Sequence, residues 1–396
     1  MRVRPENLAT SQDGVAIVAA LERAAPAEDH PQSCQVRELL RLVTRIGTCP
    51  AVHFLQTDHV RRRSSDHLGQ FRDVIGPASR RMPLDVIGHH LHFMFAQLDQ
   101  IMNDRGIGTI VVPMHEAIHA SFRWLTRNAK VTRGYVVKAA GREPILLAYP
   151  MEREEAATSG LRVQSIHDFD HERIFRAAAN PVDGYARFFD AVLRTRGGEG
   201  AVAFFGNAPI HLYQGIASEL SRHGWRVHDG GGEDVIQLAR KRKDAWEIDA
   251  IRSVGERTEA VVAVVREMLR NWREGLRIGD LKAAISHEIA RRDMIEDHET
   301  IVSHGRDAGI PHSRGDAAQI IRPGVPIVID IFPADRSTGY FFDLTRTFCV
   351  GEPSDELRRL HADVLTAHQR ASEAMRPGTE ASSYQALVCD FFEERG

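Results

Sequence analysis

The spacing of apolar positions divides the chain into an irregular opening and a long regular remainder. Residues 1–83 mix Pro, Ser, His and Arg around a single short stretch of helical spacing, so we treat them as an extension without a predicted fold. Apolar positions then recur at helical spacing in 84–106, and the β-branched run 109–113 follows as a predicted strand. The regular part of the protein is therefore expected to begin near residue 84.

Strand and helix patterns alternate over residues 84–240. Two strand-like runs, 134–140 and 144–150, are separated by Gly141-Arg142-Glu143, which predicts a hairpin. A helix is expected near 115–127, and the later order is a strand at 201–206, a helix at 210–224 and a strand at 225–230. This alternation predicts a small α/β domain.

A second domain is expected over residues 241–396, because three glycines precede a charged run that opens a long helix at 242–272. A helix at 279–293 follows it. Strand-like runs occupy 299–303, 325–332 and 340–350, and two further helices are predicted at 353–375 and from 381 onward.

Composition says more about the binding partners of the protein than about its chemical function. The 396 residues carry 51 basic and 54 acidic side chains, and the resulting net charge of −3 gives no reason to expect nucleic acid or an anionic membrane. No apolar run reaches membrane-spanning length. The four cysteines are scattered, as in proteins of a reducing compartment, so a cytoplasmic location is expected.

Two aspartates stand inside apolar, aromatic-rich runs of the predicted sheet, in "DIFPADRSTGYFFDLTRTF" (330–348). A hairpin centred between Arg336 and Ser337 would place Asp330 directly opposite Asp343, with Cβ atoms roughly 4.5–5.5 Å apart. Two carboxylates that close in an apolar setting need a cation between them, and hard oxygen ligands suit a divalent metal ion. Alternatively, one aspartate faces solvent and the other caps a turn.

The same stretch, continued through "CVGEPSDELRRLHADVLTAHQRASEAMRPG", resembles the metallopeptidases related to methionine aminopeptidase, aminopeptidase P and prolidase. The upstream segment "ETIVSHGRDAGIPHSRGD" and the join "RKRKDAWEIDAIR" are similar to the corresponding parts of that family. The resemblance covers about residues 84–396. It implies an α/β N-terminal creatinase-type domain over 84–240 and an α+β pita-bread catalytic domain from 241.

This resemblance implies roles for three residues. Asp330 would bind one metal ion, Asp343 would bridge two, and His312 would hydrogen-bond the substrate or the tetrahedral intermediate. The implied cofactors are two divalent ions (Mn, Co or Zn), and the implied partners are a peptide with proline at its second position and a second copy of the chain. The implied activity is that of an Xaa-Pro exopeptidase, in which a metal-activated water hydrolyses the N-terminal peptide bond.

The family pattern also includes a histidine and two glutamates further along the chain, whereas the sequence ends at Gly396. We therefore expect a pita-bread domain that is incomplete at its C-terminus, as in a truncated enzyme, and little or no peptidase activity from these 396 residues. Two aspartates alone make a weak metal site, because affinity depends on the number and geometry of ligands.

Two other functions remain open from the sequence. A pita-bread relative that has lost its metal ions could serve as a non-catalytic binding protein. The "HEAIH" run from His115 to His119 fits HExxH, in which two histidines one helical turn apart bind zinc. Phe122 and Leu125 stand where the extended form of that motif needs a glycine and a third histidine, so we rank the zinc protease last.

Overall fold

A computed structural model of the protein describes residues 84–115, 119–207, 209–228, 232 and 234–395. The predicted extension at 1–83 lies outside these residues. The described chain forms two compact units. The N-terminal unit comprises residues 84–249 and the turn Ser337–Gly339, and the C-terminal unit comprises 250–336 and 340–395. The division falls inside one helix, a little beyond the boundary that the sequence predicts at residue 240.

The N-terminal unit is built on a mixed five-stranded sheet of order β4-β3-β2-β1-β5. Strand β1 is antiparallel to β2 and parallel to β5, and the predicted hairpin joins β2 to the antiparallel β3. Of the expected strand at 225–230, residues 225–228 are described, and among them only Val227 pairs, in an isolated bridge with Val202. The elements of this unit are α4 (Leu84–Asp104), β1 (Ile107–His115), α5 (Ala120–Thr126), β2 (Arg133–Ala139), β3 (Ile145–Ala148), η2 (Pro150–Glu152), α6 (Arg153–Ala157), β4 (Arg162–Ser165), η3 (Ile166–Phe169), α7 (His171–Ala177), α8 (Pro181–Arg196), β5 (Ala201–Phe204), α9 (Ile210–Arg222) and α10 (Val235–Lys241).

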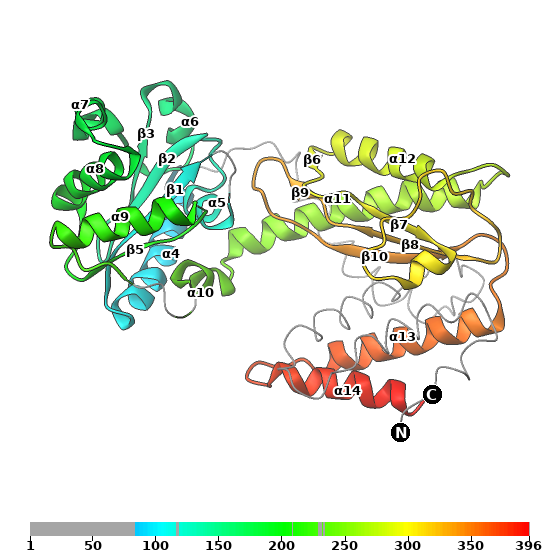
Figure 1. Ribbon diagram of the computed structural model, residues 1–396. Coiled ribbons are helices and arrows are strands. Elements are labelled where there is room, and N and C mark those ends of the chain that lie inside the picture. Colours follow the sequence, from blue (N-terminus) through cyan, green and yellow to red (C-terminus); the bar gives the residue numbers. More distant parts are fainter. Residues whose placement is uncertain (1–83, 116–118, 208, 229–231, 233, 396) are drawn as a thin grey trace. The chain divides into compact units, whose positions relative to one another are not determined.

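Helices cover both faces of this sheet (Figure 1). One apolar core joins the sheet to α4, α5 and α10, with Leu98, Phe122 and Ile236 fully buried in it. A second core joins the other face to α8 and α9, where Phe188 and Leu220 are fully buried. Successive residues of a strand point to opposite faces, so alternate residues of β1 and β2 enter the two cores. The unit is a three-layer α/β/α domain, which agrees with the expected class.

The C-terminal unit contains the three-stranded antiparallel sheet β10-β8-β7 and a small two-stranded sheet, β6-β9. The long helix that opens it begins at Ala245, within the N-terminal unit. The elements are α11 (Ala245–Arg270), α12 (Ile278–Arg291), β6 (Met294–Ile295), β7 (Ile301–His304), η4 (Gly305–Gly309), β8 (Pro326–Ile331), β9 (Ala334–Asp335), β10 (Leu344–Cys349), α13 (Asp355–Ala374) and α14 (Ala381–Glu393).

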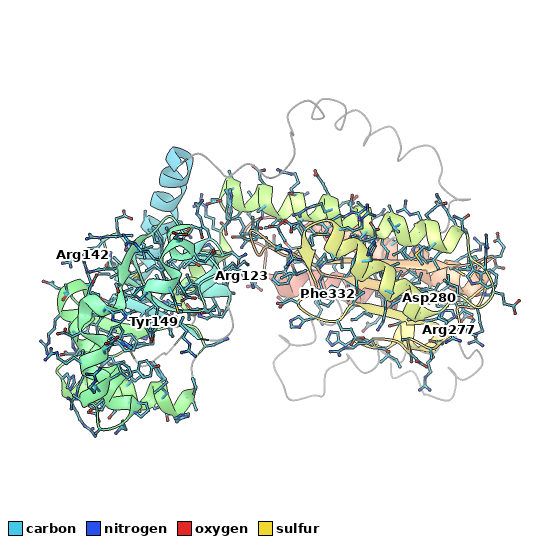
Figure 2. All side chains as sticks on the ribbon, turned by 90° about the horizontal axis from the view of Figure 1, so that it is seen from above. Arg123, Arg142, Tyr149, Arg277, Asp280 and Phe332 are labelled. Atoms are coloured by element: carbon cyan, nitrogen blue, oxygen red, sulfur yellow. The ribbon has the colours of Figure 1, made fainter. Side chains whose placement is uncertain are left out.

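Helices α11 and α12 cover one face of this three-stranded sheet. The core between them contains Val302, Ile329 and Phe348 from the strands and Val261 and Ile285 from the helices. Helix α12 begins where the Asp280 carboxylate accepts a hydrogen bond from the backbone N–H of Arg277 (2.8 Å), and Figure 2 shows both residues at this end. Helices α13 and α14 pack against each other in a small separate cluster.

The hairpin between β8 and β10 has a different register from the one predicted. Asp330 pairs with Thr345, not with Asp343, and the backbone N–H of Asp335 donates to the carbonyl of Tyr340 (2.8 Å). The centre of the hairpin therefore lies one residue later than expected. Gly339 explains the difference, because its φ of +73° fits a turn and does not fit the extended strand position that the predicted register would give it.

Candidate active site

The face of the β10-β8-β7 sheet opposite α11 and α12 is the candidate site, and we call it the carboxylate face. Directly paired residues of antiparallel strands share a face, and residues two apart in one strand do so as well. Several side chains on the carboxylate face are buried, and most of those from β7 and β10 are small and polar. They are Ile301, Ser303, Val328, Asp330, Thr345 and Thr347.

Asp330 stands at the centre of this face. It pairs with Thr345 on one side and with Ile301 on the other, and its side chain is only 7% exposed. The Thr345 hydroxyl donates a hydrogen bond to Asp330 Oδ1 (2.5 Å). A buried carboxylate requires such donors, because transfer out of water is costly without them. The interaction fixes the direction in which the carboxylate points. Sequence reasoning assigned no role to Thr345, although this residue is only two positions after Asp343.

Asp343 lies just before β10 and is exposed. The backbone N–H of Phe342 donates to the carbonyl of Pro333 (3.2 Å), so the hairpin register continues past Asp343, which stands opposite Phe332. The predicted direct opposition of Asp330 and Asp343 is therefore wrong. Asp343 is two residues from Thr345, so strand parity places it on the carboxylate face, diagonally across from Asp330. Diagonal neighbours of this kind are roughly 7–8 Å apart.

His312 is exposed and lies in the loop that leads from η4 to β8. Its φ of +62° is in the left-handed region, which few residues other than glycine adopt. The Ser313 backbone N–H donates to the carbonyl of Ile310 (3.1 Å), which closes a four-residue turn with Pro311 and His312 at its centre. A strained conformation of this kind is common at functional positions.

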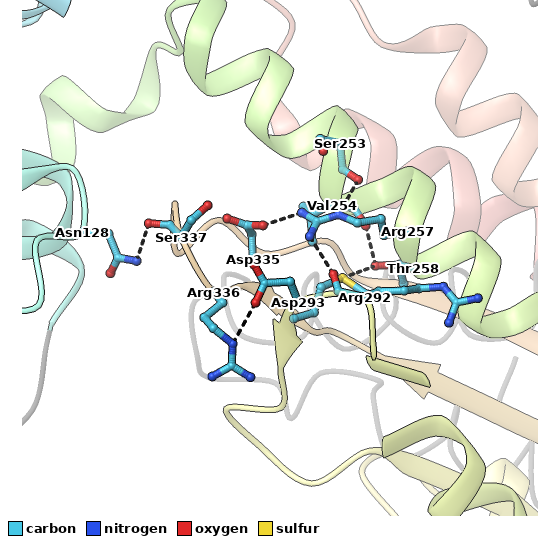
Figure 3. A network of polar contacts seen from close by, with 11 residues as sticks. Asn128, Ser253, Val254, Arg257, Thr258, Arg292, Asp293, Asp335, Arg336 and Ser337 are labelled. Carbon is cyan, nitrogen blue, oxygen red and sulfur yellow. Dashed lines mark hydrogen bonds and ion pairs between the residues drawn. The ribbon is translucent and has the colours of Figure 1, made fainter. Parts of the chain in front are cut away.

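A third aspartate of the same segment, Asp335, serves a different purpose (Figure 3). It is 6% exposed and accepts a hydrogen bond from Arg257 of α11 (2.5 Å). The same guanidinium donates to the carbonyl of Arg292 (2.9 Å), and Arg336 pairs with Asp293 (3.0 Å). These contacts tie the tip of the hairpin to α11 and to the end of α12. Sequence reasoning missed Arg257 and Asp335, because no local pattern shows which aspartate an arginine far along the chain will contact.

The turn Ser337–Gly339 groups with the N-terminal unit, in which two side chains hold its backbone. Asn128 donates to the carbonyl of Ser337 (3.0 Å), as Figure 3 shows, and Arg123 donates to the carbonyl of Gly339 (3.0 Å).

The HExxH reading does not fit the structure. His115 is the last residue of β1, and His119 is the N-cap of α5, so the two histidines are not one turn apart on a helix. His119 Nε2 lies 2.9 Å from the carbonyl oxygen of Pro113, and its Nδ1 accepts a hydrogen bond from the backbone N–H of Phe122. Both ring nitrogens are thus used locally. Residues 116–118 of the motif lie outside the described part of the chain.

The candidate metal ligands of this face are two carboxylates. Asp330 and Asp343 offer carboxylate oxygens on one face of a sheet, which fits a hard divalent cation. Among the described residues, however, no group of three or more His, Cys, Asp or Glu side chains is arranged to hold a metal ion.

Within the described part of the chain, no helix is both long enough and apolar enough to cross a membrane.

Comparison with known proteins finds similar proteins for the C-terminal segment. Residues 249–396 match the profile of metallopeptidase family M24. A probable dipeptidase PepE from Mycobacterium bovis is 32% identical over 167 residues, which are 41% of this chain and 42% of that protein. An Xaa-Pro dipeptidase from Pyrococcus furiosus is 30% identical over 165 residues, which are 41% of this chain and 46% of that protein. The chain thus matches less than half the length of either relative.

The fold likeness extends further along the chain. The solved structure of an Xaa-Pro dipeptidase from Bacillus anthracis superposes with a TM-score of 0.61 at 20% identity, covering 77% of this chain and 78% of that one. At this identity the likeness shows the fold. It confirms the expected combination of an α/β N-terminal domain and a pita-bread domain.

Proposed function

We propose that the carboxylate face is part of the active site of a metal-dependent exopeptidase, because residues 249–396 match the profile of metallopeptidase family M24. The proposed reaction is hydrolysis of the N-terminal peptide bond of substrates with proline at the second position. The observation that supports it best is the buried Asp330, which the Thr345 hydroxyl orients, with Asp343 directly before the neighbouring strand β10.

In this proposal Asp330 and Asp343 are oxygen ligands of divalent metal ions, of which Mn, Co and Zn are the candidates. When bound, such ions lower the pKa of a coordinated water and polarise the scissile carbonyl. Asp330 and Thr345 keep the ligand oxygens in a fixed direction. His312 is proposed to hydrogen-bond the substrate, and its turn presents an exposed imidazole for that purpose.

We further propose that these 396 residues alone hydrolyse peptides weakly or not at all. Two carboxylates bind a divalent ion weakly, because affinity increases with the number of ligands and the rigidity of the site. The absence of any three-residue metal-ligating group among the described residues supports this. A cytoplasmic location and a homodimer complete the proposal. Fractionation of cells and analytical ultracentrifugation of the purified protein test these two points.

The function is tested with purified protein and an Ala-Pro dipeptide at saturating Mn²⁺. Weak turnover that chelator abolishes and that Asp330→Asn removes would support a metal-dependent peptidase. Weak Mn²⁺ binding that both Asp330→Asn and Asp343→Asn remove, without turnover, would support the same site in an incomplete form. Peptide binding that is independent of metal and of both aspartates would instead favour the non-catalytic binding protein.

A further inference from the structure

The turn that carries His312 has an unusual conformation for its sequence. A positive φ after proline, with a hydrogen bond from the fourth residue to the first, is the mark of a type II turn. Glycine or asparagine normally occupies the position that His312 holds, because a Cβ is disfavoured there. Contacts outside the turn must therefore help to hold this histidine in place.

The first such contact comes from the carboxylate face. Ser303 of β7 is 2% exposed, and its hydroxyl donates to the carbonyl of Ser313 (2.5 Å), the residue directly after His312. Ser303 pairs with Val328, two positions from the pair between Ile301 and Asp330. The His312 turn is thus bonded to the strand that lies beside the Asp330 strand.

A close backbone approach strengthens the same connection. Gly315 has a φ of +73°, and a Cβ at this position would lie 2.0 Å from the carbonyl oxygen of Val302. Only glycine allows the loop to cross β7 at this distance. The loop therefore contacts β7 at Gly315, three residues after His312.

The second contact is ionic and lies at the beginning of β7. Glu299 accepts hydrogen bonds from Lys282 of α12 (2.8 Å) and from Arg314 (2.9 Å), which is two residues after His312. The hydrogen bond and charge of Lys282, followed by the charge of Arg314, hold the pKa of the Glu299 carboxyl below its usual value. Glu299 therefore remains ionised near neutral pH and links the loop to α12.

We propose that Ser303 and Glu299 are positioning residues that hold His312 in its left-handed turn relative to the Asp330 strand. The importance of this for catalysis rests on the proposed function, in which His312 contacts the substrate. A histidine that is fixed before the substrate arrives loses less conformational freedom on binding. Neither residue needs to touch the substrate.

The test uses the full 396-residue protein labelled with ¹³C and ¹⁵N at histidine. The His312 signals are assigned by their loss in His312→Asn, and their Cα and Cβ shifts report the sign of φ. We expect Ser303→Ala and Glu299→Gln each to move these shifts away from left-handed values, and the double variant to move them furthest. Ser303→Thr, which keeps the hydroxyl, should restore the shifts of the unmodified protein.

A matched control separates positioning from loss of stability. Thr258→Ala removes a buried hydroxyl that donates to the carbonyl of Val254 (2.7 Å), elsewhere in the same unit. It should lower stability and leave the His312 shifts unchanged. Shifts that stay at left-handed values in both Ser303→Ala and Glu299→Gln would overturn the proposal. Glu299 is half-exposed, so Glu299→Gln gives an answer even if Ser303→Ala fails to fold.

A separate measurement on the same sample tests the proposed function. Mn²⁺ bound near Asp330 should broaden signals of histidines close to the carboxylate face, and Asp330→Asn should abolish the broadening. Its absence from the unmodified protein would contradict the metal site and leave the result for Ser303 and Glu299 standing.

Discussion

At the scale of single residues, three aspartates of one hairpin have three different environments. Asp330 is buried and accepts the Thr345 hydroxyl, Asp335 is buried and pairs with Arg257, and Asp343 is exposed. A buried carboxylate is tolerated only where donors or a cation compensate for lost hydration. Partners supplied by the rest of the chain therefore decide the environment of each aspartate.

Arg257→Met should destabilise the C-terminal unit, because it leaves the Asp335 carboxylate buried without its cation. Breaking a buried ion pair from one side costs about 3 kcal/mol. Urea unfolding followed by tryptophan fluorescence measures the change. Arg173→Ala is the control, since the pair between Arg173 and Asp170 is well exposed and should contribute less than about 1 kcal/mol. Equal effects of the two substitutions would show that the pair between Arg257 and Asp335 contributes no more to stability than an exposed pair.

Thr345→Val should weaken Mn²⁺ binding, because the isosteric side chain cannot donate to Asp330 Oδ1 and the carboxylate loses its fixed direction. Loss of a hydrogen bond that orients a metal ligand typically reduces affinity about tenfold or more. Titration calorimetry measures the affinity, and Thr345→Ser should retain it because the hydroxyl remains. Equal affinity of the valine variant and the unmodified protein would show that Thr345 does not orient the ligand.

At the scale of elements, the loop between η4 and β8 depends on glycine as much as on side-chain contacts. Gly315 crosses β7 at a distance that excludes any side chain, and His304, 1% exposed, binds the returning loop. Its Nε2 accepts the backbone N–H of Arg322 (3.1 Å), and its Nδ1 lies 3.1 Å from the carbonyl oxygen of Pro326. Contacts with the short strand β7 therefore hold this loop at both Gly315 and Arg322.

Gly315→Ala should be strongly destabilising, and Gly378→Ala is its matched control. Both glycines have positive φ, but a Cβ at Gly378 would meet nothing within 4 Å. The control should therefore cost only the left-handed strain of alanine, roughly 1–2 kcal/mol. Gly315→Ala adds a backbone clash and should cost about 3 kcal/mol in total. Urea unfolding midpoints of the two variants test this prediction. Similar losses of stability would mean that the loop can move away from β7.

At the scale of the whole molecule, each unit has its own apolar cores, and α11 runs across the division between them. The family match begins at residue 249, one residue before the C-terminal unit. The family match therefore coincides with one unit, and the other unit has apolar cores of its own.

Stability should fall as the pH decreases below about 6.5, the unperturbed pKa of histidine. Burial lowers the pKa of His361 and of His119, so protons bind the unfolded chain before they bind the folded one. This contribution is fully present above the unfolded pKa and is lost as the pH falls towards the folded pKa. His361→Phe removes one such group. Thermal midpoints measured from about pH 7.5 to 5 should decline less in this variant than in the unmodified protein. Equal declines in the two proteins would show that His361 does not cause the loss of stability.

The sequence by itself determined which segments form helices and strands, as in α4, α11, α12 and β8, because hydrophobic period is a local property of the chain. It also indicated the family and the two aspartates, since both lie in one continuous segment. Only the tertiary structure decided the hairpin register, which differs by two residues within the same strand parity, and the partners Arg257, Thr345 and Ser303. These partners are up to 78 residues away from the groups that they hold. Local periodicity carries no information about such contacts, because they depend on how separate elements pack.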